Sequence, residues 1–366
     1  MNSAYLETSA FYGSILPIYP NFPSSDQHIV GQLALSLRKS SIANTEFGHP
    51  HSGIALSYHD FGNKKVFGYG LGLQYQITFE QSLTRKLSVI ERFKPGVIYS
   101  SKPYHYINNT SNIVFGSHYT ALMGISVGLN YRLAPKISLL LEGSLWHASN
   151  GHTDLPNVGM NSPMVGLTLR YQLSNSDTCS KPNKCLRYEN KFGLIGFSTI
   201  GINQAGGTTR PVNGDYYQKY LGGLGVFWRT RSIHRWSLTM ETYYDQTYRL
   251  WNETQEWASS NNIQESMAVM IMLGHEWLYQ RWSLLINGGI NIHNPTLDRI
   301  ITRVESESIA NTIKRYAPGR FAIRYYLSHP WKHESSAFVQ AGIKSNFGQA
   351  DFLEFGAGFV ISGQKR

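Results

Sequence analysis

Hydrophobic and polar residues alternate along most of this chain with a period of two. The segment 118–133 shows the alternation most clearly, with Gly, Ser and Asn residues between its large apolar ones. Those apolar residues are Met123, Ile125, Val127, Leu129 and Tyr131. A period of two predicts β-strands, and one apolar face with one small or polar face suits a barrel wall between lipid and a filled lumen.

About sixteen segments of this kind are predicted. Connections after even-numbered segments are mostly short and those after odd-numbered segments mostly long, which is typical of bacterial outer-membrane barrels. The predicted strands are 4–16, 27–40, 52–60, 65–80, 86–101, 118–133, 136–150, 162–174, 191–205, 216–231, 235–250, 262–279, 281–293, 317–328, 335–347 and 350–362.

The predicted fold class is therefore all-β, an antiparallel transmembrane β-barrel of the outer membrane. We expect an eight-stranded barrel over 1–174, a polar linker over 175–190, and a second β-barrel-like unit over 191–366. The alternative is one continuous barrel of about 14–16 strands. The linker favours two units, because it is much longer than the other connections on the short-turn side. It carries the only cysteines, Cys179 and Cys185, and a disulfide between them is predicted in an oxidising compartment.

Composition agrees with this fold class. Only 15% of the 366 residues are charged and 13% are aromatic, and no apolar run is long enough for a membrane-spanning helix. The net charge of +10 fits an anionic partner such as a phosphorylated lipid surface, and nothing resembles nucleic-acid recognition. No metal or cofactor motif is predicted, and nothing specifies an oligomeric state. The first residues lack a secretory signal, so we expect the leader of an exported protein to be missing from this sequence.

Candidate chemistry lies in the hairpin over 136–173. His147 and Ser149 are two residues apart on one strand, and Asn161 shares their parity on the next, so all three fall on the apolar face. Serine ester hydrolysis needs a base and a group that orients the base, and an amide can fill the third role. If the hairpin register places Ser149 near Asn161, the Asn161 amide oxygen can accept the second imidazole proton. The alternative is a polar strand end in which His147 caps an interfacial belt beside Trp146.

Oxyanion donors are available in the loop that follows. The backbone amides of Asn150 and Gly151, or the side chains of Asn150 and Asn157, are the candidates.

These residues resemble a known family. The runs His-Ala-Ser-Asn-Gly at 147–151 and Pro-Asn-Val-Gly-Met-Asn at 156–161, which contains Gly159, resemble the signature of PagL-type lipid A 3-O-deacylases, also called acyloxyacyl hydrolases. Residues 108–117 look like the matching upstream segment of larger members, and the resemblance covers about 4–174. It implies an eight-stranded barrel with its catalytic group on the lipid-facing wall, Ser149 as nucleophile, His147 as base, and Asn161 where the family often has Glu.

The predicted function is an outer-membrane lipid A deacylase, a serine esterase whose partner is lipopolysaccharide in the outer leaflet. The alternatives are a non-enzymatic barrel, either channel or scaffold, and a lapsed hydrolase that binds lipid. The second half loosely repeats the first: Ser345-Asn346 aligns with Ser149-Asn150, but Ile343 stands where His147 does. Without a base, no serine chemistry is expected there.

Overall fold

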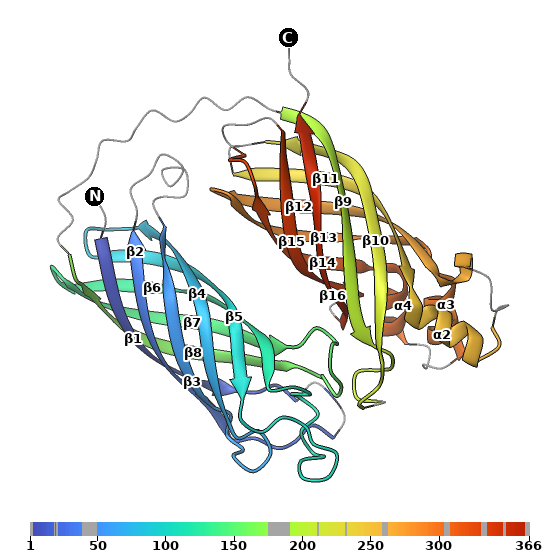
Figure 1. The fold of residues 1–366 in the computed structure, drawn as a ribbon. Coiled ribbons are helices and arrows are strands. Elements are labelled where there is room, and N and C mark those ends of the chain that lie inside the picture. The colour runs from blue at the N-terminus through green and yellow to red at the C-terminus, as the bar shows by residue number, and fades with distance from the viewer. Residues whose placement is uncertain are drawn as a thin grey trace. The chain divides into compact units, whose positions relative to one another are not determined.

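The protein, seen in a computed structural model, forms two closed eight-stranded antiparallel barrels (Figure 1). One continuous barrel, the alternative allowed by the sequence, is therefore wrong. The structure describes residues 3–17, 19, 21–38, 50–174, 191–210, 212–230, 233–257, 263–303, 308–330, 335–346 and 349–362. The predicted Cys179–Cys185 disulfide lies outside these residues.

The first barrel closes by pairing its first strand with its eighth, so that Tyr5 lies opposite Gln172 and Gly13 opposite Met164. Every other pair joins strands that are consecutive in the chain. Its strands are β1 (Ser3–Ser14), β2 (Gln27–Arg38), β3 (His51–Asp60), β4 (Tyr69–Ser82), β5 (Leu87–Ser100), β6 (Tyr119–Ala134), β7 (Ile137–Ser149) and β8 (Met160–Gln172).

The second barrel repeats this topology and closes between its first and last strands, with Leu353 opposite Ile202 and Ser362 opposite Gly193. Its strands are β9 (Lys191–Gln204), β10 (Tyr216–Arg229), β11 (His234–Asp245), β12 (Met267–Tyr279), β13 (Trp282–His293), β14 (Pro318–Tyr326), β15 (Ser335–Asn346) and β16 (Gln349–Ser362).

Helices in the long loops of the second barrel were not predicted. The strand expected to reach residue 250 ends at Asp245, whose carboxylate accepts a hydrogen bond from the Thr247 backbone N–H and begins a helix. The helical elements are α2 (Gln246–Thr254), η1 (Ile263–Ser266), α3 (Pro295–Arg303) and α4 (Ile309–Tyr316). None of the helices that the structure describes is long and apolar enough to cross a membrane.

Both barrels carry apolar side chains outside and polar ones inside. On β6, for example, Ile125, Val127 and Leu129 are exposed while Ser126 and Asn130 are buried. This is the reverse of a soluble protein and is the arrangement that a hydrocarbon solvent requires.

The lumen of the first barrel is filled by a network of ion pairs. The Arg92 guanidinium donates to Glu7 at 2.8 Å and to Glu142 at 3.1 Å, and Arg170 donates to Glu7 at 2.7 Å and to Glu80 at 2.9 Å. Glu142 and Arg170 both point into the lumen, as the alternation places them. They do not pair with each other: Glu142 pairs with Arg92, and Arg170 pairs with Glu7 and Glu80. Such buried charges persist only when they are paired and hydrogen-bonded.

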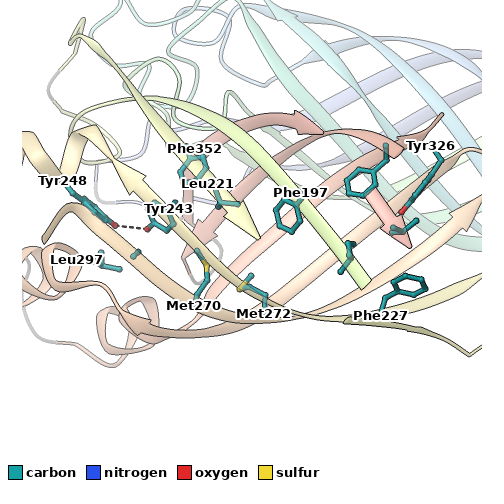
Figure 2. Packing of buried hydrophobic residues seen from close by; sticks show 14 of the residues in the cluster. Phe197, Leu221, Phe227, Tyr243, Tyr248, Met270, Met272, Leu297, Tyr326 and Phe352 are labelled. Atoms are coloured by element: carbon teal, nitrogen blue, oxygen red, sulfur yellow. Dashed lines mark hydrogen bonds between the residues drawn. The ribbon is translucent and has the colours of Figure 1, made fainter. Parts of the chain in front are cut away.

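The lumen of the second barrel is filled in the same way and adds an apolar cluster. Arg320 pairs with Glu241 at 2.8 Å and with Glu354 at 2.6 Å. Figure 2 shows the cluster inside the sheet, with Phe197, Met270 and Met272 among its labelled members. Near the helical end, the Tyr243 and Tyr248 hydroxyls lie 3.4 Å apart (Figure 2). Among the residues that the structure describes, ion pairs fill the first lumen, and ion pairs and apolar side chains fill the second.

Candidate active site on the outer wall of the first barrel

The β7–β8 hairpin places the three predicted catalytic residues at one end of the outer wall. Trp146 and Ala148 are buried inside, so their neighbours His147 and Ser149 have the outward parity of exposed Leu145, although His147 is half-buried and Ser149 is buried at the strand end. On β8, Asn161 lies directly opposite His147. The register therefore places Asn161 across from the imidazole itself, two positions away from the place beside Ser149 that the sequence interpretation considered.

A hydrogen bond joins two of these residues across the hairpin. His147 Nδ1 lies 2.8 Å from Asn161 Oδ1. An amide oxygen can only accept, so the Nδ1 atom carries the proton and Nε2 presents its lone pair. That tautomer is the one in which an imidazole acts as a general base through Nε2.

Ser149 is held from the other side by the site loop, which we define as residues 150–159 between β7 and β8. The Asn157 Nδ2 atom donates to Ser149 Oγ at 2.9 Å, and Asn157 Oδ1 accepts from the Asn150 backbone N–H at 3.2 Å. The bond from Asn157 uses a lone pair of the hydroxyl oxygen and not its proton, which is the proton a base removes. Asn157 thus orients the serine oxygen and presents an amide donor beside it.

Gly159 ends the site loop beside both His147 and Ser149. A Cβ atom at this position would lie 3.2 Å from the Ala148 carbonyl oxygen, which is a tight contact, and at ordinary contact distances of 3.5 Å from His147 Cε1 and 3.6 Å from Ser149 Cβ. Its φ of 76° belongs to the left-handed region that favours glycine. Glycine is therefore favoured by the turn, and an added methyl would crowd the Ala148 carbonyl oxygen beside the site.

The other predicted oxyanion residues have structural partners. The Asn150 backbone N–H binds Asn157 Oδ1, and the Asn150 side chain donates to the Asp154 carbonyl at 2.6 Å. Gly151 begins the loop with a φ of 66°. Among these residues, Asn157 is the one whose amide donor already contacts the serine oxygen.

A second loop supports the site loop, and sequence reasoning noted this segment without giving it a role. The Val158 backbone N–H donates to the Ile113 carbonyl at 3.0 Å. Buried Asn112 shapes this second loop, because its Oδ1 accepts from the backbone N–H of Val114 and Phe115 while its Nδ2 donates to the Lys102 carbonyl at 2.7 Å. Ile113 and Asn112 both belong to the segment 108–117 of the family resemblance.

Aromatic and histidine side chains pack behind the site, inside the barrel. The Trp146 indole N–H donates to Ser144 Oγ at 3.0 Å, and its ring contacts Phe11 and His59 edge-on at 5.5 and 5.3 Å between centroids. His59 in turn shares a hydrogen bond with His28 at 3.1 Å. This dense packing gives the strand that carries His147 a rigid support.

The corresponding place in the second barrel lacks the chemistry. Its seventh and eighth strands, β15 and β16, pair Ile343 with Leu353 where the first barrel pairs His147 with Asn161. Across the part of the chain that the structure describes, no group of three or more His, Cys, Asp or Glu residues is placed to hold a metal ion.

Comparison with protein families finds a match over residues 190–363, to the family described as acyloxyacyl hydrolase, C-terminal domain. This match supports the resemblance to PagL-type acyloxyacyl hydrolases that the motif in the first barrel indicates. The match covers the second barrel, whereas the His-Ala-Ser-Asn motif lies in the first. No curated protein matches the chain.

Solved structures with partial similarity include a neisserial surface protein and a protein of Acinetobacter baumannii. Neisserial surface protein A is 9% identical, with 47% of this chain and 98% of that chain covered and a TM-score of 0.32. Acinetobacter baumannii OccAB3 is 7% identical, with 99% of both chains covered and a TM-score of 0.22. Scores this low carry no argument. Two closed barrels that are apolar outside and charged inside, together with this family match, place the protein in the bacterial outer membrane.

Proposed function

We propose that the chain is an outer-membrane lipid A deacylase, a serine esterase that removes an ester-linked acyl chain from lipopolysaccharide. The observation that carries the proposal is the 2.8 Å bond between His147 and Asn161 on the lipid-facing wall, two residues from Ser149. A base with an orienting partner has little structural value at a hydrocarbon boundary, but it is what ester hydrolysis requires.

In the proposed reaction, His147 Nε2 takes the Ser149 hydroxyl proton as the serine oxygen bonds to the ester carbonyl carbon. The Asn157 amide then donates to the developing oxyanion. As the tetrahedral intermediate collapses, the bond to the sugar oxygen breaks and the imidazolium returns the proton to it. Water, deprotonated by His147, then cleaves the acyl–serine ester, and the fatty acid leaves into the membrane.

The surroundings of the site suit an acyl chain. Leu145, Ile125 and Val165 are about half exposed or more on the outer wall of β7, β6 and β8, on the side of the site away from the loops. In a membrane these side chains face hydrocarbon, so an acyl chain lying against them brings its ester to the rim where Ser149 is. The net charge of +10 favours the phosphates of the lipid A head.

The filled lumen weighs against the channel alternative. Arg92 and Glu142 are fully buried in the first barrel, as are Arg320 and Glu354 in the second, and these pairs occupy the space that an aqueous pore would need. Single-channel recording in a planar bilayer is expected to show no conductance steps. Discrete open levels would favour the channel.

Mass spectrometry of lipid A from an outer-membrane host tests the proposal. Cells that express the chain are expected to contain lipid A lacking one acyl chain, and cells that express Ser149→Ala or His147→Gln are expected to retain it. Thr168→Ser, which keeps the hydroxyl that donates to Glu142 inside the barrel, is a matched control that should behave as wild type. Identical acylation in all strains, or full activity in Ser149→Ala, would exclude this mechanism.

A further inference from the structure

The short helix α4 of the second barrel exposes its apolar stripe. Ile309, Ile313 and Tyr316 lie at positions i, i+4 and i+7, and their side chains are 83%, 37% and 49% exposed. Residues with this spacing share one face of a helix. A helix on the surface of a water-soluble protein turns that face toward the core, so α4 has the opposite orientation.

Its polar stripe, in contrast, is attached to the protein. The Arg315 guanidinium donates to Asp298 of α3 at 2.6 Å, and its backbone carbonyl accepts from Asn291 Nδ2 of β13 at 2.8 Å. The Ser308 hydroxyl caps the first turn by accepting from the Asn311 backbone N–H at 3.1 Å. These bonds hold α4 with its polar side inward and its apolar side outward.

The position of α4 in the chain keeps it at the rim of the barrel. It ends at Tyr316, and β14 begins two residues later at Pro318. The helix contacts β13, whose outward-facing Ile290 and Ile292 are 64% and 59% exposed. The apolar stripe is therefore continuous with the lipid-facing wall, and a shallow hollow lined by Ser308, Ile309, Thr312 and Ile313 follows it.

We propose that α4 is an interfacial helix whose stripe of Ile309, Ile313 and Tyr316 inserts into the acyl and headgroup boundary of the leaflet around the second barrel. Amphipathic helices bind this boundary with the apolar face buried by about 5–10 Å, and tyrosine is enriched there. The occupant is the lipid itself. The inference rests on the membrane location and not on hydrolysis by the first barrel, so it stands or fails independently of the deacylase activity.

Site-directed fluorescence in vesicles tests the proposal with the full chain. The background variant is Cys179→Ser with Cys185→Ser, and an environment-sensitive dye is attached at Ile313→Cys or, separately, at Tyr316→Cys. The vesicles contain phosphatidylcholine and phosphatidylglycerol, with or without a lipid that carries a nitroxide near the top of its acyl chain. Thr302→Cys on α3, an exposed polar position, serves as the matched control.

Dye at positions 313 and 316 is expected to emit at shorter wavelength than dye at 302 and to be quenched by the nitroxide lipid. Water-like emission without quenching at both positions would overturn the proposal. Short-wavelength emission that the nitroxide does not quench would also overturn it, because the stripe would then contact protein instead of lipid. Using two labelled positions guards against a variant that fails to fold.

Discussion

His147 Nδ1 and Asn161 Oδ1 lie 2.8 Å apart on residues that face each other directly across β7 and β8. The partner is a neutral amide, which orients the imidazole but supplies no charge to the imidazolium that forms during catalysis. Hydrogen bonds that involve a charged group exceed neutral ones by about 1 kcal/mol.

Replacing the amide by an acid is therefore expected to accelerate the reaction. Asn161→Glu should raise kcat by ~5-fold or more, the rate equivalent of that energy difference. Asn161→Leu, which keeps the size but removes the acceptor, should lower kcat by ~10²-fold because the imidazole loses its orientation. Release of fatty acid from lipid A in vesicles measures both. Equal kcat values for Asn161→Leu and the wild type would show that the side chain at 161 does not orient the base.

Asn157 offers a way to separate its two contacts. Asn157→Asp keeps an oxygen for the Asn150 backbone N–H but loses the amide donor to Ser149, so kcat should fall by ~10²-fold, as for removal of one oxyanion donor. Asn157→Ala loses both contacts and should also lower the unfolding temperature of the site loop region. If Asn157→Asp retains wild-type kcat, Asn157 is a loop residue only.

Gly159→Ala is expected to damage activity and stability together. The left-handed φ of 76° costs a non-glycine residue about 1–2 kcal/mol, and the added methyl would lie 3.2 Å from the Ala148 carbonyl oxygen, which must shift beside His147 and Ser149. The matched control is Gly31→Ala on the outer wall, where no atom lies within 4 Å of the added methyl. Calorimetry and fatty-acid release should show losses for Gly159→Ala alone. Similar behaviour of the two variants would contradict this role for Gly159.

Asp154 in the site loop predicts a pH-dependent stability change. The side chain is half-buried, and desolvation raises the pKa of its carboxyl above the usual value. A raised folded-state pKa means that ionisation opposes folding, with no cost below the unfolded-state pKa and the full cost above the folded-state pKa. Asp154→Asn should therefore raise the unfolding temperature slightly at pH 7. It should leave the unfolding temperature unchanged at acid pH, where the Asp154 carboxyl of the wild type is protonated in both the folded and the unfolded state. A larger gain at acid pH would contradict the sign.

Arg92 tests the ion-pair network of the first lumen. Arg92→Leu leaves the buried Glu142 without its cation, and breaking a buried pair in this way costs about 3–5 kcal/mol. The double variant Arg92→Leu with Glu142→Gln removes both charges and should recover part of the loss. Urea unfolding in vesicles measures each step. Equal stability of wild type and Arg92→Leu would show that the network is not needed.

Sequence alternation predicted the sixteen strands because side-chain parity is a local property, as on β6, where Ile125 and Ser126 face opposite sides. Closure into two barrels depends on contacts between residues far apart, such as Tyr5 with Gln172, and local pattern cannot choose between one barrel and two. The helix α4 was not predicted, because the spacing of its few apolar residues, taken from the sequence without tertiary contacts, also fits an irregular loop.

Parity likewise placed His147 and Asn161 on one face, because both lie on regular strands. The register that sets them opposite each other, and the contact of Asn157 with Ser149, depend on how the site loop folds between the strands. The sequence motif indicated these residues, but only the structure gives the distances between their side chains.

Covalent capture of the serine tests the central claim most directly. A long-chain alkyl fluorophosphonate, supplied in lipid vesicles, reacts with a serine oxygen only when a base activates it. Peptide mapping by mass spectrometry is expected to find the phosphonate adduct on Ser149 in the wild type and no adduct in His147→Gln. Absence of an adduct in folded wild-type protein, or equal labelling of both proteins, would contradict an outward-facing serine activated by His147.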